Sequence, residues 1–149
     1  MLTELRIRDL GVIAELHVAL GPGMTAVTGE TGAGKTMVVE AIDLLVGGRA
    51  DGTRVRSGAE EAWVEGRFVV GDDEVVLARA VPAAGRSRAY VDGRMAPAAA
   101  LAEVGARLVD LHGQHAAQSL FTTAAQRAAL DAFAGVDLAP LAAARRRRR

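Results

Sequence analysis

One eight-residue segment constrains the fold of this chain more than any other feature of its sequence. The segment fits the pattern G-x-x-x-x-G-K-[S/T] and reads Gly29-Glu30-Thr31-Gly32-Ala33-Gly34-Lys35-Thr36. The pattern needs a β-strand before it and an α-helix after it, because its backbone N–H groups must converge beside the first helical turn. Met24–Thr28 is β-prone, and Val38, Ile42 and Leu45 have helical spacing. The sequence therefore predicts an α/β fold of the P-loop class.

The glycine-rich loop predicts an anion site that takes the phosphates of a nucleotide. Three glycines allow the backbone N–H groups to point inward, and the dipole of the next helix attracts negative charge. Lys35 is expected to bridge the terminal phosphates, and Thr36 to offer its hydroxyl to Mg²⁺. The predicted nucleotide-binding set is Gly29, Glu30, Thr31, Gly32, Ala33, Gly34, Lys35 and Thr36. The competing interpretation is a glycine-rich turn that binds no ligand.

Lys35 is the only lysine of the chain, and every other basic side chain except three histidines is arginine. A lysine amine is a compact, flexible point charge, whereas the arginine guanidinium is a rigid fork. The single lysine stands at the position of the motif that would contact the β- and γ-phosphates of a nucleotide. A rigid arginine guanidinium is less suited to this contact. This placement favours nucleotide binding.

Composition is typical of a globular protein. Half of the 149 residues are hydrophobic and 24% are charged. The sequence has no run of about 18 apolar residues and no secretory signal pattern, so we expect a cytoplasmic protein that does not engage a membrane. Because there are no cysteines, disulfides and thiolate metal sites are excluded. The five arginines Arg145–Arg149 leave the rest of the chain net acidic, and we expect them to form a solvated end rather than a nucleic-acid contact.

Periodicity predicts a series of strands and helices. A hairpin is expected over Leu2–Leu20 and a meander with antiparallel character over Ala62–Val70, Glu74–Val81 and Ser87–Val91. Helices are expected over Thr36–Val46, Pro97–Leu108 and Thr123–Phe133, with a strand at Leu108–Leu111 and another helix from Leu138. Combined with the strand before the loop, these antiparallel pairs predict a mixed sheet with flanking helices.

Hydrolysis of a nucleotide also needs a carboxylate for the metal and a group that positions water. The nearest candidate is Asp110, which follows Leu108 and Val109, although Arg107 interrupts the apolar run. Its alternative is an ordinary strand residue with polar surroundings. A metal pair of His112 and His115 is disfavoured, because no third ligand is near and Gly113 disfavours a helix.

Four separate stretches together resemble one family. The stretches are Leu5–Ile13, Gly29–Thr36, Asp43–Ala50 and Val109–His115. Read together, they closely resemble the N-terminal part of RecN, a family of bacterial DNA repair and recombination ATPases related to the SMC proteins. The likeness runs through most of residues 1–122 and is more specific than the loop alone.

The resemblance implies an ABC/SMC-type head that is split in sequence. Residues 1–122 would be the N-terminal lobe, and residues 123–149 a helical segment leading to a coiled coil, with a C-terminal lobe beyond it. In the family, a glutamine between the lobes touches the metal and the attacking water, and Gln114 looks like its counterpart. The resemblance thus implies catalytic roles for Lys35 and Gln114 and metal contacts for Thr36 and Gln114. Without it, Gln114 is an ordinary loop amide.

The sequence also departs from the family pattern. It contains no Leu-Ser-Gly-Gly signature and no strand-terminal Asp-Glu pair. We therefore expect an ATP-binding half that takes ATP and Mg²⁺ but does not hydrolyse ATP efficiently alone. Through the full-length protein, the resemblance implies partners in a C-terminal ATPase lobe, DNA and a head-to-head dimer, in repair of DNA double-strand breaks at the nucleoid.

Other interpretations remain open. A small P-loop phosphotransferase would use the same loop with Arg86 and Arg88 as lid arginines, although such kinases usually open directly on the strand before the loop. A non-catalytic fragment or interaction module is the third. Arg54, Arg56 and Arg67 are interleaved with glutamates, which favours a solvated mixed face over a DNA-facing or phosphate-facing patch. No motif separates ATP from GTP.

Overall fold

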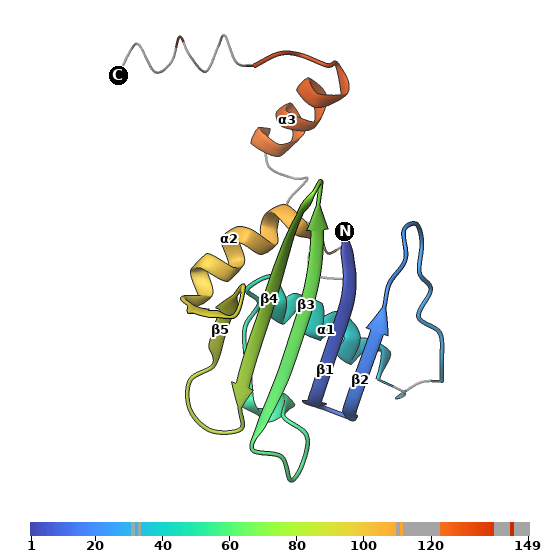
Figure 1. Ribbon diagram of the computed structural model, residues 1–149, viewed down its shortest axis with the longest axis vertical. Helices are drawn as coiled ribbons and strands as arrows, with labels where there is room; N and C mark the ends of the chain where they lie inside the picture. The colour runs from blue at the N-terminus through green and yellow to red at the C-terminus, as the bar shows by residue number, and fades with distance from the viewer. Residues whose placement is uncertain (31, 33, 110, 112–122, 139–143, 145–149) are drawn as a thin grey trace. The chain divides into compact units, whose positions relative to one another are not determined.

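A computed structural model describes residues 1–30, 32, 34–109, 111, 123–138 and 144 (Figure 1). The chain divides into two compact units, Met1–Asp110 and Leu111–Arg149. The first unit contains a β-sheet with helices α1 (Lys35–Leu45) and α2 (Ala98–Leu108). The second contains helix α3 (Thr123–Phe133), with the bounds that periodicity predicts. Leu138 is not helical, and the helix predicted after it falls almost entirely outside the described residues.

Six strands form one sheet in the order β2-β1-β3-β4-β5-β6. Every pairing in it is antiparallel. The strands are β1 (Leu2–Leu10), β2 (Ile13–Ala19), β3 (Glu61–Val70), β4 (Asp73–Pro82), β5 (Arg88–Val91) and β6 (Arg94–Ala96). The predicted hairpin and meander are confirmed, whereas β6 and the short 3₁₀ helix η1 (Gly52–Arg54) were not expected.

The prediction of a mixed sheet is wrong for the residues that the structure describes. Residues 21–30, which include the β-prone segment Met24–Thr28, are all exposed and join no strand. Near the other expected strand, Leu108 belongs to α2 and Val109 is extended outside any strand, while Asp110 lies outside the described residues. A β-prone segment becomes a strand only where a neighbour takes its backbone hydrogen bonds. In the described part of the chain, neither segment has such a neighbour.

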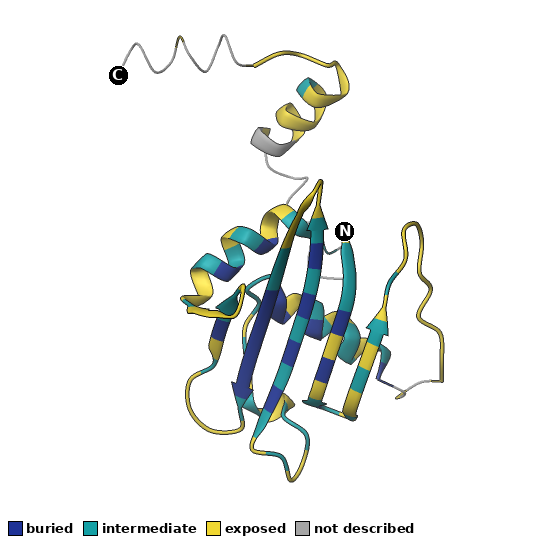
Figure 2. Cartoon of the chain, viewed as in Figure 1, coloured by how far each residue is buried: buried dark blue, intermediate teal, exposed yellow. Residues whose placement is uncertain are grey.

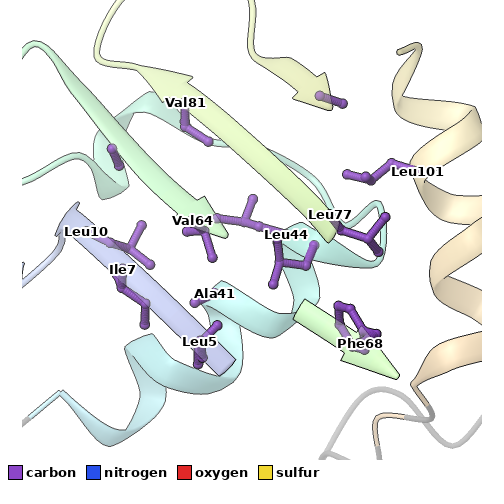
Figure 3. Packing of buried hydrophobic residues seen from close by; sticks show 13 residues of the cluster. Leu5, Ile7, Leu10, Ala41, Leu44, Val64, Phe68, Leu77, Val81 and Leu101 are labelled. Atoms are coloured by element: carbon purple, nitrogen blue, oxygen red, sulfur yellow. The ribbon is translucent and has the colours of Figure 1, made fainter. Parts of the chain in front are cut away.

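The core lies between the sheet and the two helices of the first unit. Alternation along β3 buries Ala62, Val64 and Phe68 on one face, where α1 contributes Ala41 and Leu45. Figure 2 shows the alternation of burial along β3, and Figure 3 labels Val64, Phe68 and Ala41 within the core. The period of two in the strands and of 3.6 in the helices thus directs both sets of side chains to one layer. No helix among the described residues is long and apolar enough to cross a membrane.

Helices α1 and α2 approach so closely that glycines are required at their contact. A Cβ built on Gly105 of α2 would lie 2.5 Å from the Cα atom of Val46, the residue after α1. A Cβ on Gly47 would lie 2.4 Å from the Cβ atom of Ala102. Both clashes involve atoms that no rotamer change can move, so the glycines fix the position of the C-terminal end of α1.

We predict that Gly105→Ala destabilises the fold by up to about 2 kcal/mol, because the cost of overpacking outweighs the gain in helix propensity. Alanine normally stabilises a helix interior by about 1 kcal/mol relative to glycine, but overpacking against backbone costs about 1–3 kcal/mol. Urea unfolding measures the change in free energy. The control Ala106→Gly, at an exposed position of α2, should cost about 1 kcal/mol from helix propensity alone. A gain in stability for Gly105→Ala would contradict the close approach.

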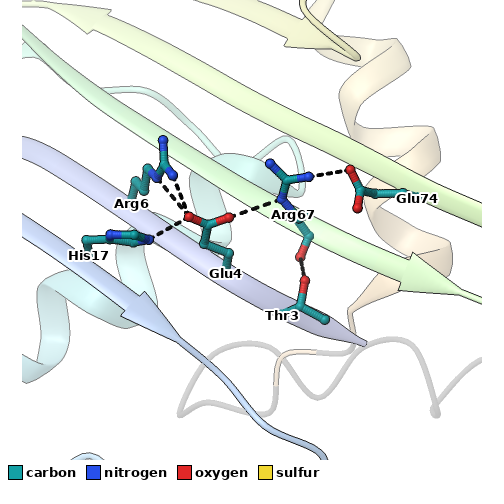
Figure 4. A network of polar contacts seen from close by, with 6 residues as sticks. All are labelled: Thr3, Glu4, Arg6, His17, Arg67 and Glu74. Atoms are coloured by element: carbon teal, nitrogen blue, oxygen red, sulfur yellow. Dashed lines mark hydrogen bonds and ion pairs between the residues drawn. The ribbon is translucent and has the colours of Figure 1, made fainter.

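The opposite face of the sheet carries a network of charged side chains (Figure 4). The carboxylate of Glu4 accepts hydrogen bonds from Arg6 and Arg67 and contacts Nε2 of His17 at 2.5 Å. Arg67 also pairs with Glu74 at 2.5 Å. These contacts, that with Arg6 foremost, lower the pKa of Glu4 from 4.5 to about 2. Since Arg67 is occupied by two carboxylates, the network favours a mixed charged face over a nucleic-acid patch.

The network predicts a loss of stability in acid. A carboxylate whose folded-state pKa is depressed contributes stability that is complete above its unfolded pKa of about 4.5 and is lost as the pH falls toward about 2. Glu4→Gln should therefore flatten the decline of the melting temperature between these pH values. The matched control is Glu103→Gln, at an exposed position of α2. If Glu4→Gln melts in parallel with the wild type across this range, the network contributes nothing.

Candidate functional site

The predicted phosphate loop leads directly into α1. Gly34 precedes the helix in the left-handed conformation, with φ 93° and ψ 5°. Its carbonyl oxygen accepts hydrogen bonds from the N–H groups of Met37 and Val38 at 3.0 and 3.2 Å. Gly29 and Gly32 also have positive φ, at 152° and 87°. The loop thus places the N-terminus of a helix, which attracts anions, at its own end.

The loop lies against the turn of the β1–β2 hairpin. A Cβ built on Gly34 would lie 3.3 Å from Cγ2 of Val12 and 3.3 Å from Cγ1 of Ile13. Gly11, in the same turn, has a φ of 55° and contacts the side chain of Met37. A Cβ built on Gly11 would lie 2.4 Å from the sulfur atom of Met37. Contacts from both sides therefore fix the start of α1 beside this turn.

The ammonium group of Lys35 folds back over the loop that precedes it. Its Nζ atom donates to the carbonyl oxygens of Gly29 and Glu30 at 2.5 and 2.7 Å. An ammonium group has three donors, and these two bonds leave one for a further acceptor. The positive charge therefore lies inside the bend of the loop, close to the N-terminus of α1.

A cavity of about 480 Å³ opens beside the loop. Its described lining includes the two cations Lys35 and Arg54 and contains no carboxylate. The lining residues are Gly11, Val12, Gly32, Gly34, Lys35, Thr36, Met37, Thr53 and Arg54. Two cations, a helix N-terminus and two threonine hydroxyls suit a multiply charged anion that accepts hydrogen bonds.

The wall opposite the loop comes from η1, which the sequence did not predict. The side chain of Asp51 caps η1 by accepting from the N–H and hydroxyl of Thr53 at 2.9 and 2.8 Å. The N–H of Gly11 donates to the carbonyl oxygen of Arg54 at 2.7 Å, and a bridge pairs Leu10 with Val55. Asp51-Gly52-Thr53 is a recognisable turn signal, but no pattern showed that it would join the hairpin.

Several residues singled out from the sequence are not tested by the structure. Gln114, Asp110, His112, His115, Thr31, Ala33 and the run Arg145–Arg149 all lie outside the described residues. Arg86 is exposed in the β4–β5 loop, and Arg88 pairs with Glu61 across the sheet. Neither arginine is among the described residues that line the cavity, so the structure gives the phosphotransferase alternative no lid.

The contact between Gly34 and the hairpin generates a prediction. Gly34→Ala should lower the free energy of unfolding by about 1–3 kcal/mol, because a non-glycine residue at positive φ is strained and the new Cβ presses on Val12 and Ile13. Gly23→Ala is the control, since Gly23 has a similar φ of 95° but no atom within 4 Å. Chemical denaturation of both variants isolates the packing contribution, and equal losses would show that the contact is unimportant.

Comparison with known proteins adds a family and a set of relatives. The sequence profile of the family described as "AAA domain" matches residues 4–91. DNA repair protein RecN from Streptomyces coelicolor is 50% identical over 156 residues, which are 93% of this chain and 27% of the relative. RecN from Bacillus subtilis is 38% identical, with the same shares covered. The chain thus spans about a quarter of the length of these curated relatives.

A solved structure has the same fold. It comes from work on the ATP-driven dimerization and DNA-stimulated activation of SMC ATPases, and it matches with a TM-score of 0.64 at 20% identity. The match covers 87% of this chain and 97% of that chain. The expected fold class, the N-terminal lobe of an SMC-type head, is therefore confirmed, although its sheet is antiparallel in the described residues.

Proposed function

The protein belongs to the AAA domain family, whose profile matches residues 4–91, and from this membership we propose that it is the ATP-binding N-terminal part of a RecN-like ATPase acting in recombinational repair of DNA double-strand breaks. Its similarity to RecN proteins over 93% of the chain supports this proposal. The observation that carries it is the position of Lys35, whose ammonium group lies over the glycine-rich loop at the start of α1.

In this proposal, the loop and the first turn of α1 bind the phosphates. The backbone N–H groups near Gly32 and Gly34 take phosphate oxygens, because positive φ turns the peptide groups into a concave surface. Lys35 exchanges its bonds to the carbonyls of Gly29 and Glu30 for bonds to the terminal phosphates. Glu30, Thr31 and Ala33 complete the loop as proposed nucleotide contacts.

The proposed metal is Mg²⁺, bound with the nucleotide. The hydroxyl of Thr36 is a ligand of suitable chemistry, because Mg²⁺ prefers oxygen donors and retains several waters. Thr36 is exposed at the cavity and begins the helix together with Lys35, so its hydroxyl has room to reach such an ion. Bound Mg²⁺ would neutralise charge that develops on the phosphates. Gln114 is proposed as a second metal contact and as the group that orients water.

Hydrolysis is proposed to require a second lobe. Phosphoryl transfer needs a carboxylate that holds the metal, and the described lining of the cavity contains none. We therefore assign ATP binding to this chain and efficient turnover to its assembly with a C-terminal ATPase lobe, with DNA and with a second head. On the face of the sheet opposite α1, Arg67 forms ion pairs with Glu4 and Glu74, so this face gives no support to a DNA site. Action on DNA would place the parent protein at the nucleoid.

One alternative keeps specific support. A non-catalytic fragment or interaction module would share the loop but bind no nucleotide, and the exposed segment Met24–Thr28 is compatible with it. Nucleotide titration separates the two, because a ligand that binds only the folded state raises its stability by RT ln(1 + [L]/Kd).

We predict that MgATP at 100 times its Kd stabilises the chain by about 2.7 kcal/mol, and that Lys35→Ala removes this effect. Thermal unfolding with and without nucleotide measures it. The control Arg107→Ala, at an exposed position of α2, should retain the full effect. Stabilisation that persists in a folded Lys35→Ala variant would refute the proposed site, and hydrolysis by the chain alone at an ordinary enzymatic rate would refute the division between lobes.

A further inference from the structure

Arg54 lies between two cavities of opposite character. On one side is the cavity of about 480 Å³ beside the phosphate loop, whose described lining has no carboxylate. On the other side is a cavity of about 300 Å³ whose lining includes the carboxylates of Glu40, Asp43 and Asp51. Of the described residues, Arg54 is the one that lines both cavities. Arg54 therefore borders one cavity that contains carboxylates and another whose described lining contains none.

The backbone at Arg54 is fixed although its side chain is held weakly. Its carbonyl oxygen accepts from the N–H of Gly11 at 2.7 Å, and the next residue, Val55, bridges to Leu10. Two residues further, the N–H and guanidinium of Arg56 donate to the carbonyl oxygens of Asp9 and Val12, each at 2.8 Å. These bonds hold the segment against the hairpin, so only the side chain of Arg54 is able to change its environment.

Among the described residues, the side chain of Arg54 forms one ion pair, with Glu40, and is also attracted by the nearby charge of Asp51. Nη2 lies 3.3 Å from Oε1 of Glu40, and the arginine side chain is 54% exposed. Ion pairs this open to solvent are weak, because water screens both charges. A polyphosphate carries more negative charge than one carboxylate and accepts hydrogen bonds from both arms of a guanidinium. A polyphosphate in the neighbouring cavity would therefore outcompete Glu40.

We propose that Arg54 is a second cationic ligand of the nucleotide phosphates, which Glu40 holds aside until the nucleotide binds. This inference rests on the proposed function and adds a residue that no sequence pattern assigned to the site. Glu40 lies on α1, five positions after Lys35, and has a side chain that is 29% exposed. It acts as a positioning residue, because it competes with the phosphates for Arg54 without touching them.

Calorimetric titration of the whole 149-residue chain with MgATP tests the proposal. Arg54→Ala should weaken binding of MgATP about tenfold, because it removes one charge-assisted hydrogen bond to the phosphates. Glu40→Gln should tighten binding about two- to threefold, because it removes a weak competing ion pair. A merely structural role would not produce these opposite signs. The double variant should bind like Arg54→Ala, since the effect of Glu40 is exerted through Arg54.

The controls separate this inference from the proposed function. Arg49→Ala, a neighbouring arginine that lines only the acidic cavity of the two, should bind MgATP like the wild type. Thermal unfolding of each variant without nucleotide confirms that it is folded. If Lys35→Ala loses binding while a folded Arg54→Ala retains wild-type affinity, the role of Arg54 is refuted and the proposed function stands. If Glu40→Gln weakens binding, the competition is refuted. A folded wild type that does not bind MgATP refutes both proposals.

Discussion

The burial of one face of α1 against the antiparallel sheet is the interaction on which the rest of the structure depends. Ala41 and Leu45 of α1 are completely buried among side chains of β1, β3 and β4. Each fully buried leucine contributes about 1.5–3 kcal/mol, and glycines at the α1–α2 contact exclude any sideways shift at the other end. With the helix axis thus fixed, the N–H groups of its first turn have one direction.

Much of this architecture could be predicted from the sequence, because its helices and strands have strongly periodic patterns of apolar residues. The hairpin, the meander and the three α-helices of the described residues followed from spacings of two and 3.6, and α3 has the bounds that were predicted. The β-prone segment Met24–Thr28 shows where such reasoning fails. Strand propensity describes how a residue fits a pleated surface, and within the described residues this segment pairs with no strand.

Only one wall of the candidate site could be predicted from the sequence, for a related reason. The loop from Gly29 to Thr36 is contiguous, so its chemistry could be recognised from spacing alone. The opposite wall depends on hydrogen bonds that cross more than 40 residues, from Gly11 to Arg54 and from Arg56 to Val12. No local pattern encodes such contacts. For Arg54 the sequence therefore favoured a solvated mixed face over a DNA-facing or phosphate-facing patch, although the structure places it on the same cavity as Lys35.

The order of the strands bears on how the chain folds. Four of the five pairings join strands that are consecutive in sequence, and only β1 with β3 closes a long loop, one that contains β2, the phosphate loop and α1. Local pairings form fast, whereas the entropy of closing a long loop must be overcome before its contacts contribute. We therefore expect the pairing of β1 with β3 to be the slowest step in forming the sheet. Since α1 and the glycine-rich loop lie within the segment that this pairing closes, and α1 contacts both strands, the same step brings the candidate site to the sheet.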